Sequence, residues 1–149
     1  MSKIEGERDF LTVNIAVLTV SDSRSLEDDK SGLALVERIK AAGHSVAARD
    51  IVKDEVDLIV SKLNEWIADD NVDAVIATGG TGITGRDITP EAFAKVYEKE
   101  IPGFGELFRW ISYQKISTST IQSRATAGLA NGTYLFALPG SPGACKDGW

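Results

Sequence analysis

The stretch TGGTGITGRDITP, residues 78–90, decides the fold class of this chain. It follows the apolar run DAVIA (residues 73–77), which predicts a buried strand, and it precedes EAFAKVY (residues 91–97), which predicts a helix. We expect Thr89 to cap that helix and Pro90 to occupy its first position. The stretch is therefore a loop between the carboxyl end of a strand and a helix, where open α/β sheets bind their ligands.

The composition of this loop favours a phosphate ligand. It holds four glycines, Gly79, Gly80, Gly82 and Gly85. Glycines let backbone N–H groups approach an anion closely. The loop is neither a Walker A motif nor the dinucleotide fingerprint, and a tight strand-to-helix turn is the plainer alternative. The cation and the acid that follow the glycines, Arg86 and Asp87, favour a nucleotide with its Mg²⁺.

The whole chain fits a single α/β domain. Its 149 residues predict a flexible polar arm over residues 1–11 and one folded unit over residues 12–149. A net charge of −6 argues against nucleic-acid binding, and no apolar run is long enough to span a membrane. A single cysteine excludes an internal disulfide, and one cysteine with one histidine cannot form a zinc cluster. The single histidine also argues against a Ser-His-Asp device. We expect no signal peptide and a cytoplasmic location.

The remaining pattern predicts strands alternating with helices. The expected strands cover residues 13–20, 46–52, 73–77, 125–130 and 133–138, with the last two joined by an Asn131-Gly132 hairpin turn. The expected helices cover residues 31–42, 55–69, 91–97 and 106–116, with a turn at residues 101–105, a loop or cap at 117–120 and a loop at 139–143. This order predicts a three-layer, doubly wound fold with a mainly parallel sheet and an antiparallel addition.

Four of the predicted loops should share one edge of that sheet. They are residues 21–30, 53–54, 78–87 and 139–143. If the first strand lies between the second and third, Asp54 and Asp87 leave from strands roughly 10 Å apart, which suits a metal and phosphates between them. A purely structural role is open for both, since Asp54 can cap a helix and Asp87 can interact with a helix dipole.

Other polar and aromatic residues have two open roles each. Glu106 faces the site or lies in the first turn of a helix, and the helix role is favoured slightly. Ser141 binds a phosphate or polar ring, or serves only the local turn. Trp66 is expected in the core, whereas Trp110 packs on the core or lies at a subunit contact.

The loop at residues 78–90 resembles the signature of the molybdenum-cofactor biosynthesis family that includes MoaB, Mog and the G domain of gephyrin. Four more segments look like family segments and occur in the family order. They are VSDSR (20–24), IPGFGE (101–106), IQSRA (121–125) and LPGSPGAC (138–145). The resemblance covers about residues 12–149 and is closest to the MoaB branch, through QSRA, ANGT and GACKD.

The resemblance implies a molybdopterin-binding-domain fold and a Mg²⁺-dependent adenylylation of molybdopterin by ATP. Asp54 and Asp87 match the two functional aspartates, which would be catalytic and organise the Mg²⁺ and the phosphates. The nucleotide-binding residues would be Gly79, Gly80, Thr81, Gly82 and Arg86. The substrate-binding residues would be Ser21, Asp22, Glu106, Ser141, Pro142 and Gly143. The expected partners are molybdopterin, a nucleoside triphosphate, further copies of the chain in a trimer or hexamer, and other proteins of the pathway.

Two departures from the family pattern leave the activity open. Adenylylating relatives often have Pro-Asp where this chain has Lys53 before Asp54. Family members also continue into a helix and tail beyond the position of Trp149, so either the natural protein is short or this chain is a trimmed product, and a tryptophan at the terminus favours the second. An adenylyltransferase is the first hypothesis, a pterin- or nucleotide-binding accessory protein without turnover is the second, and an oligomeric scaffold is the third. The sequence does not decide whether the nucleotide is ATP or GTP, or whether the chain forms a trimer or a hexamer.

Overall fold

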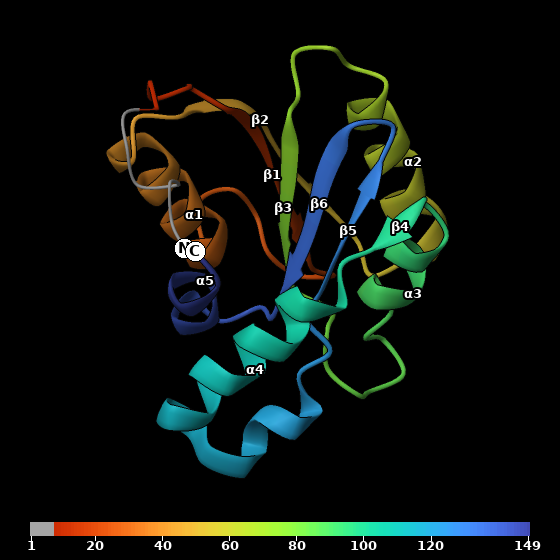
Figure 1. The fold of residues 1–149 in the computed structure, drawn as a ribbon. Helices are drawn as coiled ribbons and strands as arrows, with labels where there is room; N and C mark the ends of the chain where they lie inside the picture. Colours follow the sequence, from red (N-terminus) through yellow and green to blue (C-terminus); the bar gives the residue numbers. More distant parts are fainter. Residues whose placement is uncertain (1–7) are drawn as a thin grey trace.

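The computed structural model describes residues 8–149, which form one six-stranded mixed sheet in the order β2-β1-β3-β6-β5-β4 (Figure 1). The parallel strands are β1 (Asn14–Val20), β2 (Ser45–Val52), β3 (Ala74–Thr78) and β6 (Thr133–Leu138). The antiparallel strands are β5 (Thr126–Ala130) and the short β4 (Lys99–Glu100). The predicted fold class is confirmed, as is the position of β1 between β2 and β3.

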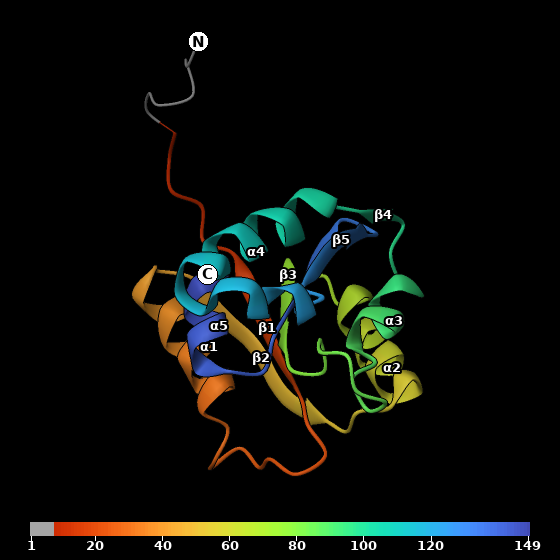
Figure 2. The same cartoon turned by 90° about the horizontal axis from the view of Figure 1, so that it is seen from below.

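Helices cover both faces of the sheet and complete the three layers (Figures 1 and 2). One face carries α1 (Lys30–Ala41), α4 (Pro102–Ile116) and α5 (Pro142–Gly148), and the other carries α2 (Val56–Ile67) and α3 (Thr89–Ala94). Each apolar layer is buried, with Leu35 and Ile39 of α1 on one side and Leu63 and Phe93 on the other. Burying a side chain of this size stabilises the fold by about 1.5–3 kcal/mol.

The carboxyl ends of the four parallel strands align at one edge. Thr78 at the end of β3 pairs with Thr19 of β1 and with Leu138 of β6, so these strands end at nearly the same level. Figure 2 views the molecule from below, onto this edge and the connections that leave it. The Asn131-Gly132 turn between β5 and β6 takes left-handed φ values of 47° and 78°, as a tight hairpin of this type requires.

Several predicted boundaries are wrong. The expected turn at residues 101–105 is the beginning of α4, because Pro102 occupies its first turn, where a missing N–H costs nothing. Residues 117–122 form a 3₁₀ helix, η1 (Ser117–Gln122), and β4 was not predicted. The expected loop at 139–143 ends at Ser141, which caps α5 by accepting a hydrogen bond from the N–H of Ala144 at 3.1 Å.

Two of the expected helix caps are also wrong. The N-cap of α2 is Glu55 rather than Asp54, and the N-cap of α3 is Ile88 rather than Thr89. Among the tryptophans, Trp66 lies in the core as predicted, whereas Trp110 is 64 % exposed and does not. The predicted arm of residues 1–11 falls mostly outside the described residues. Within residues 8–149, no helix has the length and apolar character needed to cross a membrane.

Candidate functional site

The glycine loop begins with a close contact between backbones. Gly79 and Gly80 have φ values of 106° and 71°, which side chains rarely adopt. A Cβ on Gly79 would lie 2.3 Å from the carbonyl oxygen of Val20, so only glycine fits beside the end of β1. The Thr89 hydroxyl donates to the Gly79 carbonyl at 2.8 Å, and its N–H donates to the Gly80 carbonyl at 3.0 Å. The loop is thus held against both the sheet edge and α3.

Asp87 closes the far end of the loop with its side chain turned inward. Its carboxylate accepts hydrogen bonds from the Thr84 N–H at 2.9 Å and the Thr84 hydroxyl at 2.7 Å. A Cβ on Gly82 would lie 2.7 Å from the same carboxylate. Partial burial alone would raise the pKa of Asp87, but the hydrogen bonds from Thr84 and the Gly82 backbone lower it below its ordinary value. Asp87 is therefore ionised across the physiological pH range.

Asp54 lies on the other side of the glycine loop, in the connection from β2 to α2. One of its carboxylate oxygens is 3.2 Å from the position that a Cβ on Gly80 would take. Since Glu55 occupies the N-cap of α2, the Asp54 side chain is not used for capping. Burial, followed by the charge of Asp22, raises the pKa of Asp54 above its ordinary value, and the charge of Asp87 adds to the effect.

A two-pronged ion pair joins the glycine loop to the loop after β1. The Arg86 Nε and Nη2 atoms donate to the two carboxylate oxygens of Asp22 at 2.9 and 2.8 Å. The Asp54 N–H donates to the same carboxylate at 3.1 Å. The hydrogen bond from Arg86, then that from the Asp54 backbone, lowers the pKa of Asp22. Three of the predicted residues, Asp22, Asp54 and Arg86, thus meet in one cluster.

A cavity of about 520 Å³ brings the glycine loop together with the loop before α5. It is lined by Gly80, Thr81, Gly82 and Asp87 on one side and by Ser141 on another. Helix α4 supplies part of its wall, which sequence reasoning did not foresee. Three of the predicted nucleotide residues therefore share one space with the predicted Ser141, whereas Gly79 and Arg86 do not line it.

Neighbouring residues brace this cavity. The Ser21 hydroxyl accepts from the N–H of Arg24 at 3.1 Å and so folds the loop after β1. Arg24 Nη2 then donates to the Gly140 carbonyl at 3.1 Å. Pro142 and Gly143 lie in the first turn of α5, directly behind Ser141. Ser21 supports the site through local turn contacts, and its predicted role as a substrate contact stays a prediction.

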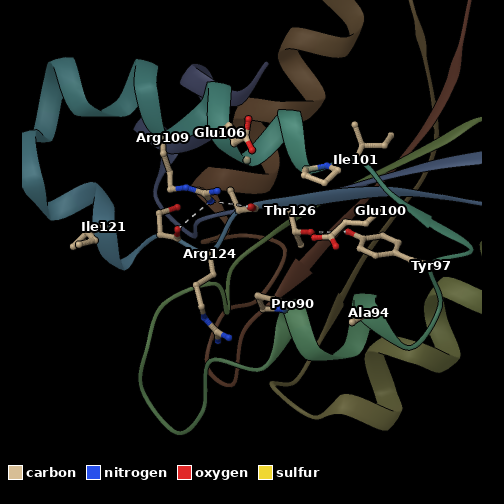
Figure 3. A pocket seen from close by; sticks show the side chains of 14 residues that line it. Pro90, Ala94, Tyr97, Glu100, Ile101, Glu106, Arg109, Ile121, Arg124 and Thr126 are labelled. Atoms are coloured by element: carbon tan, nitrogen blue, oxygen red, sulfur yellow. Dashed lines mark hydrogen bonds between the residues drawn. The ribbon is translucent and has the colours of Figure 1, made fainter.

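Glu106 lies apart from these residues. It lines a larger cavity of about 710 Å³ between α3, α4 and β5, together with Tyr97 and Arg109 (Figure 3). The glycine loop and Asp87 line the smaller cavity and not this one, so we place the candidate site in the smaller cavity. Asp54 lies beside the loop at Gly80, outside the lining of either cavity. The side chain of Glu106 is exposed in the second turn of α4. Its role as a substrate contact stays a prediction that the cavity geometry does not support.

The acidic residues fit a divalent cation that is shared with phosphates. Within residues 8–149, no three acidic, histidine or cysteine side chains converge closely enough to form a protein-only metal site. Burial, and after it the charges of Asp22 and Asp87, raises the pKa of Asp54, and a cation beside these carboxylates would offset the repulsion between them. Mg²⁺ commonly uses one or two carboxylates and takes its other ligands from phosphates and water. Asp54 and Asp87 fit that pattern.

Comparison with known proteins gives the same picture. A family described as "Probable molybdopterin binding domain" matches residues 16–149. The chain belongs to this family. Molybdenum cofactor biosynthesis protein B of Escherichia coli K12 is 47 % identical over 149 residues, covering 100 % of this chain and 86 % of the relative. Its Bacillus subtilis counterpart is 47 % identical over 135 residues, or 90 % of this chain and 79 % of that relative.

Solved structures of family members share the fold. A crystal structure of a molybdenum cofactor biosynthesis protein B superposes with a TM-score of 0.91 at 43 % identity, covering 95 % of this chain and 88 % of that one. The tungsten cofactor synthesizing protein MoaB from Pyrococcus furiosus gives a TM-score of 0.83 at 38 % identity, covering 92 % of this chain and 88 % of that one. The resemblance to the MoaB and Mog family is confirmed.

Proposed function

We propose that this chain is a molybdopterin adenylyltransferase of molybdenum-cofactor biosynthesis. The observation that carries the proposal is the placement of two carboxylates on the two sides of one glycine loop, Asp54 beside Gly80 and Asp87 beside Gly82. The cavity along this loop also reaches Ser141, which leaves room for a second ligand next to the nucleotide. The names of the relatives support the pathway, and the loop chemistry supports the reaction class.

The reaction is a transfer of an adenylyl group between phosphates. A phosphate oxygen of molybdopterin attacks the α-phosphorus of ATP and forms a new P–O–P linkage. The bond from the α-phosphorus to its bridging oxygen breaks, and pyrophosphate leaves with that electron pair. No covalent bond to the protein is required, so the residues act by positioning and by neutralising charge.

Each part of the site has a role in this scheme. The amides of the glycine loop bind the phosphates, and Arg86 adds a positive charge once it is released from Asp22. Asp54 and Asp87 would hold Mg²⁺, which neutralises phosphate charge when it is bound. Ser141 and the first turn of α5 would orient the pterin. The choice of ATP over GTP is tested directly by competition between the two nucleotides.

A pyrophosphate-release assay tests this proposal. We expect wild-type protein to release pyrophosphate only when ATP, molybdopterin and Mg²⁺ are all present. Asp87→Ala should lower kcat by about 10²–10³-fold because an oriented charge at the reacting phosphates is lost. Asp57→Asn, an exposed change in the first turn of α2, is the matched control and should leave the rate unchanged. Absence of turnover in the wild type, or full rate in Asp87→Ala, contradicts the proposal.

A pterin- or nucleotide-binding accessory protein is the second candidate. It is favoured by the Asp22–Arg86 pair, which occupies the arginine that a transferase would direct at phosphates. It is also favoured by Lys53, which replaces the proline of adenylylating relatives. This candidate predicts saturable binding of molybdopterin or nucleotide with no pyrophosphate release, so measurable turnover eliminates it.

Assembly into a homotrimer or hexamer is also part of the proposal. Helix α4 and η1 expose a series of large apolar side chains, Leu107, Trp110, Tyr113, Ile116 and Ile121. An exposed apolar patch of this kind is typical of a protein–protein interface. Contacts with other proteins of the pathway and a cytoplasmic location belong to the same proposal.

A further inference from the structure

Arg124 makes an unusual set of contacts with the glycine loop. It lies between η1 and β5, more than 35 residues away in the sequence from every loop residue that it binds. Its backbone N–H donates to the Thr81 carbonyl at 2.9 Å. Its Nε donates to the Gly82 carbonyl at 2.8 Å, and its Nη2 donates to the Asp87 carbonyl at 2.8 Å. One residue therefore holds both ends of the segment 81–87.

These bonds orient the amides of the loop. In a trans peptide the N–H and the C=O of one unit point in opposite directions. Because Arg124 holds the carbonyls of residues 81, 82 and 87, the N–H groups of residues 82, 83 and 88 point away from it. The Gly82 N–H is among the groups that stabilise the Asp87 carboxylate. Arg124 thus fixes the direction of these three amides, of which that of Gly82 faces the Asp87 carboxylate.

The guanidinium of Arg124 is already neutralised. Its Nη1 donates to the Glu91 carboxylate at the start of α3, so an acid compensates the charge. Its remaining bonds go to backbone carbonyls of the glycine loop, and Arg124 also lines the larger cavity (Figure 3). Arginine suits this role because its fork carries five donors in fixed geometry. These contacts leave Arg124 poorly placed to bind a phosphate itself.

We propose that Arg124 is a positioning residue for the nucleotide site, which holds loop 81–87 and Asp87 in the shape that binds phosphates. This inference rests on the proposed function for its kinetic consequence, but its structural part stands separately. Arg109 offers a matched comparison, because its Nη1 donates to the carbonyls of Ser123 and Ala125 at 3.3 and 3.2 Å. Arg109 therefore braces the same segment from the other side without reaching the glycine loop (Figure 3).

The test compares Arg124→Lys with Arg109→Lys. Lysine keeps the charge but cannot reproduce the fork, so a purely electrostatic role would be preserved and a positioning role would be lost. We expect Arg124→Lys to accelerate amide hydrogen exchange in residues 82–88 by at least about tenfold. We expect its kcat to fall about 10–100-fold, since a small misplacement at a reacting centre is costly. Arg109→Lys should leave both the amide exchange of residues 82–88 and kcat close to their wild-type values.

Several outcomes overturn the inference. Unchanged exchange in loop 82–88 of Arg124→Lys, or equal losses in Arg109→Lys, shows that Arg124 has no specific effect on the loop. A raised KM for ATP with unchanged kcat shows instead a direct contact with phosphate. If the wild type has no turnover, the proposed function fails, and the exchange measurement alone still decides whether Arg124 holds the loop.

A second variant covers the case in which Arg124→Lys does not fold. Glu91→Ala removes the exposed acid that holds Arg124 Nη1, so the guanidinium loses one of its three side-chain hydrogen-bond partners and holds the loop carbonyls less firmly. We expect a smaller change in the same direction, about two- to fivefold in the exchange of residues 82–88. No change in loop exchange, measured on protein with an unaltered melting temperature, counts against the inference.

Discussion

At the scale of single residues, Asp54 combines a proposed catalytic role with a cost in stability. Burial and the charges of Asp22 and Asp87 raise its pKa in the folded chain above the unfolded value. The folded state then binds the proton more tightly, so this group's stabilising contribution is present at acid pH and is lost as pH rises through the folded pKa. At pH 7 the ionised Asp54 therefore destabilises the fold.

We expect Asp54→Asn to raise the melting temperature at pH 7 by roughly 1–4 °C while it abolishes pyrophosphate release. Thermal unfolding at pH 7 and again near pH 4 measures the effect, and the advantage should shrink at the lower pH. Asp57→Asn is the control, because Asp57 is an acid in the first turn of α2 and its loss should lower stability slightly. A melting temperature that falls in Asp54→Asn at pH 7 contradicts this expectation.

Substitutions of Arg86 and Asp22 should change the affinity for nucleotide in opposite directions. Both side chains are well exposed, at 61 % and 42 %, so the pair contributes little to stability. Asp22 nevertheless competes with phosphate for the Arg86 fork. We expect Arg86→Ala to weaken binding of Mg-ATP about fivefold at low salt, and Asp22→Asn to tighten it two- to threefold. Calorimetric titration at two salt concentrations measures both, and a parallel loss in the two variants is the contrary result.

At the scale of elements, the joint between β3 and α3 depends on Gly79. Alanine there would combine a φ of 106° with a Cβ placed 2.3 Å from the Val20 carbonyl oxygen. We expect Gly79→Ala to reduce the free energy of unfolding by about 2–4 kcal/mol, because backbone must move on both sides. Gly85 is the control within the same loop, since a Cβ on it meets no atom within 4 Å. Urea unfolding should show no more than a small change for Gly85→Ala.

Local sequence patterns predicted the elements that depend on local signals and missed those that depend on contacts between distant segments. The β3–loop–α3 unit was found because glycines, a proline and an apolar run are local signals. The start of α4 was missed because Gly105 resembles a turn residue. Position 105 needs glycine because α4 packs closely on the segment before β5, where a Cβ at this position would lie 2.5 Å from the Ala125 carbonyl oxygen. The α2 cap was misplaced by one residue, which changed Asp54 from a capping residue into a free carboxylate.

The residues of the candidate site that follow strand ends could be predicted from local signals, whereas those that act through tertiary contacts could not. The Gly79–Gly82 segment, Asp54 and Asp87 follow strand ends, and topology alone brings such ends together. Arg124 was not singled out, because its four bonds reach a segment that is distant in the sequence. Only its place in the IQSRA motif could have drawn attention to it. A residue that acts on backbone carbonyls carries no composition signal of its own.

At the scale of the whole molecule, the exposed apolar face of α4 predicts self-association. Trp110 on this face is 64 % exposed, and burying such a ring would stabilise an interface substantially. The same helix lines the candidate cavity, so an interface on its outer face would also hold the cavity wall in place. Association and activity should therefore be linked, with the interface and the site on two sides of one helix.

Trp110→Glu should reduce the mass in solution from an oligomer to a single chain, since a charge at the centre of an apolar contact is costly to bury. Light scattering after gel filtration measures this, together with pyrophosphate release at the same protein concentration. Leu33→Glu on α1 replaces another exposed apolar side chain, 46 % exposed, and should change neither readout. A monomeric wild type would contradict the predicted assembly. A variant that dissociates yet keeps its full rate would show that α4 holds the cavity wall without help from a second copy.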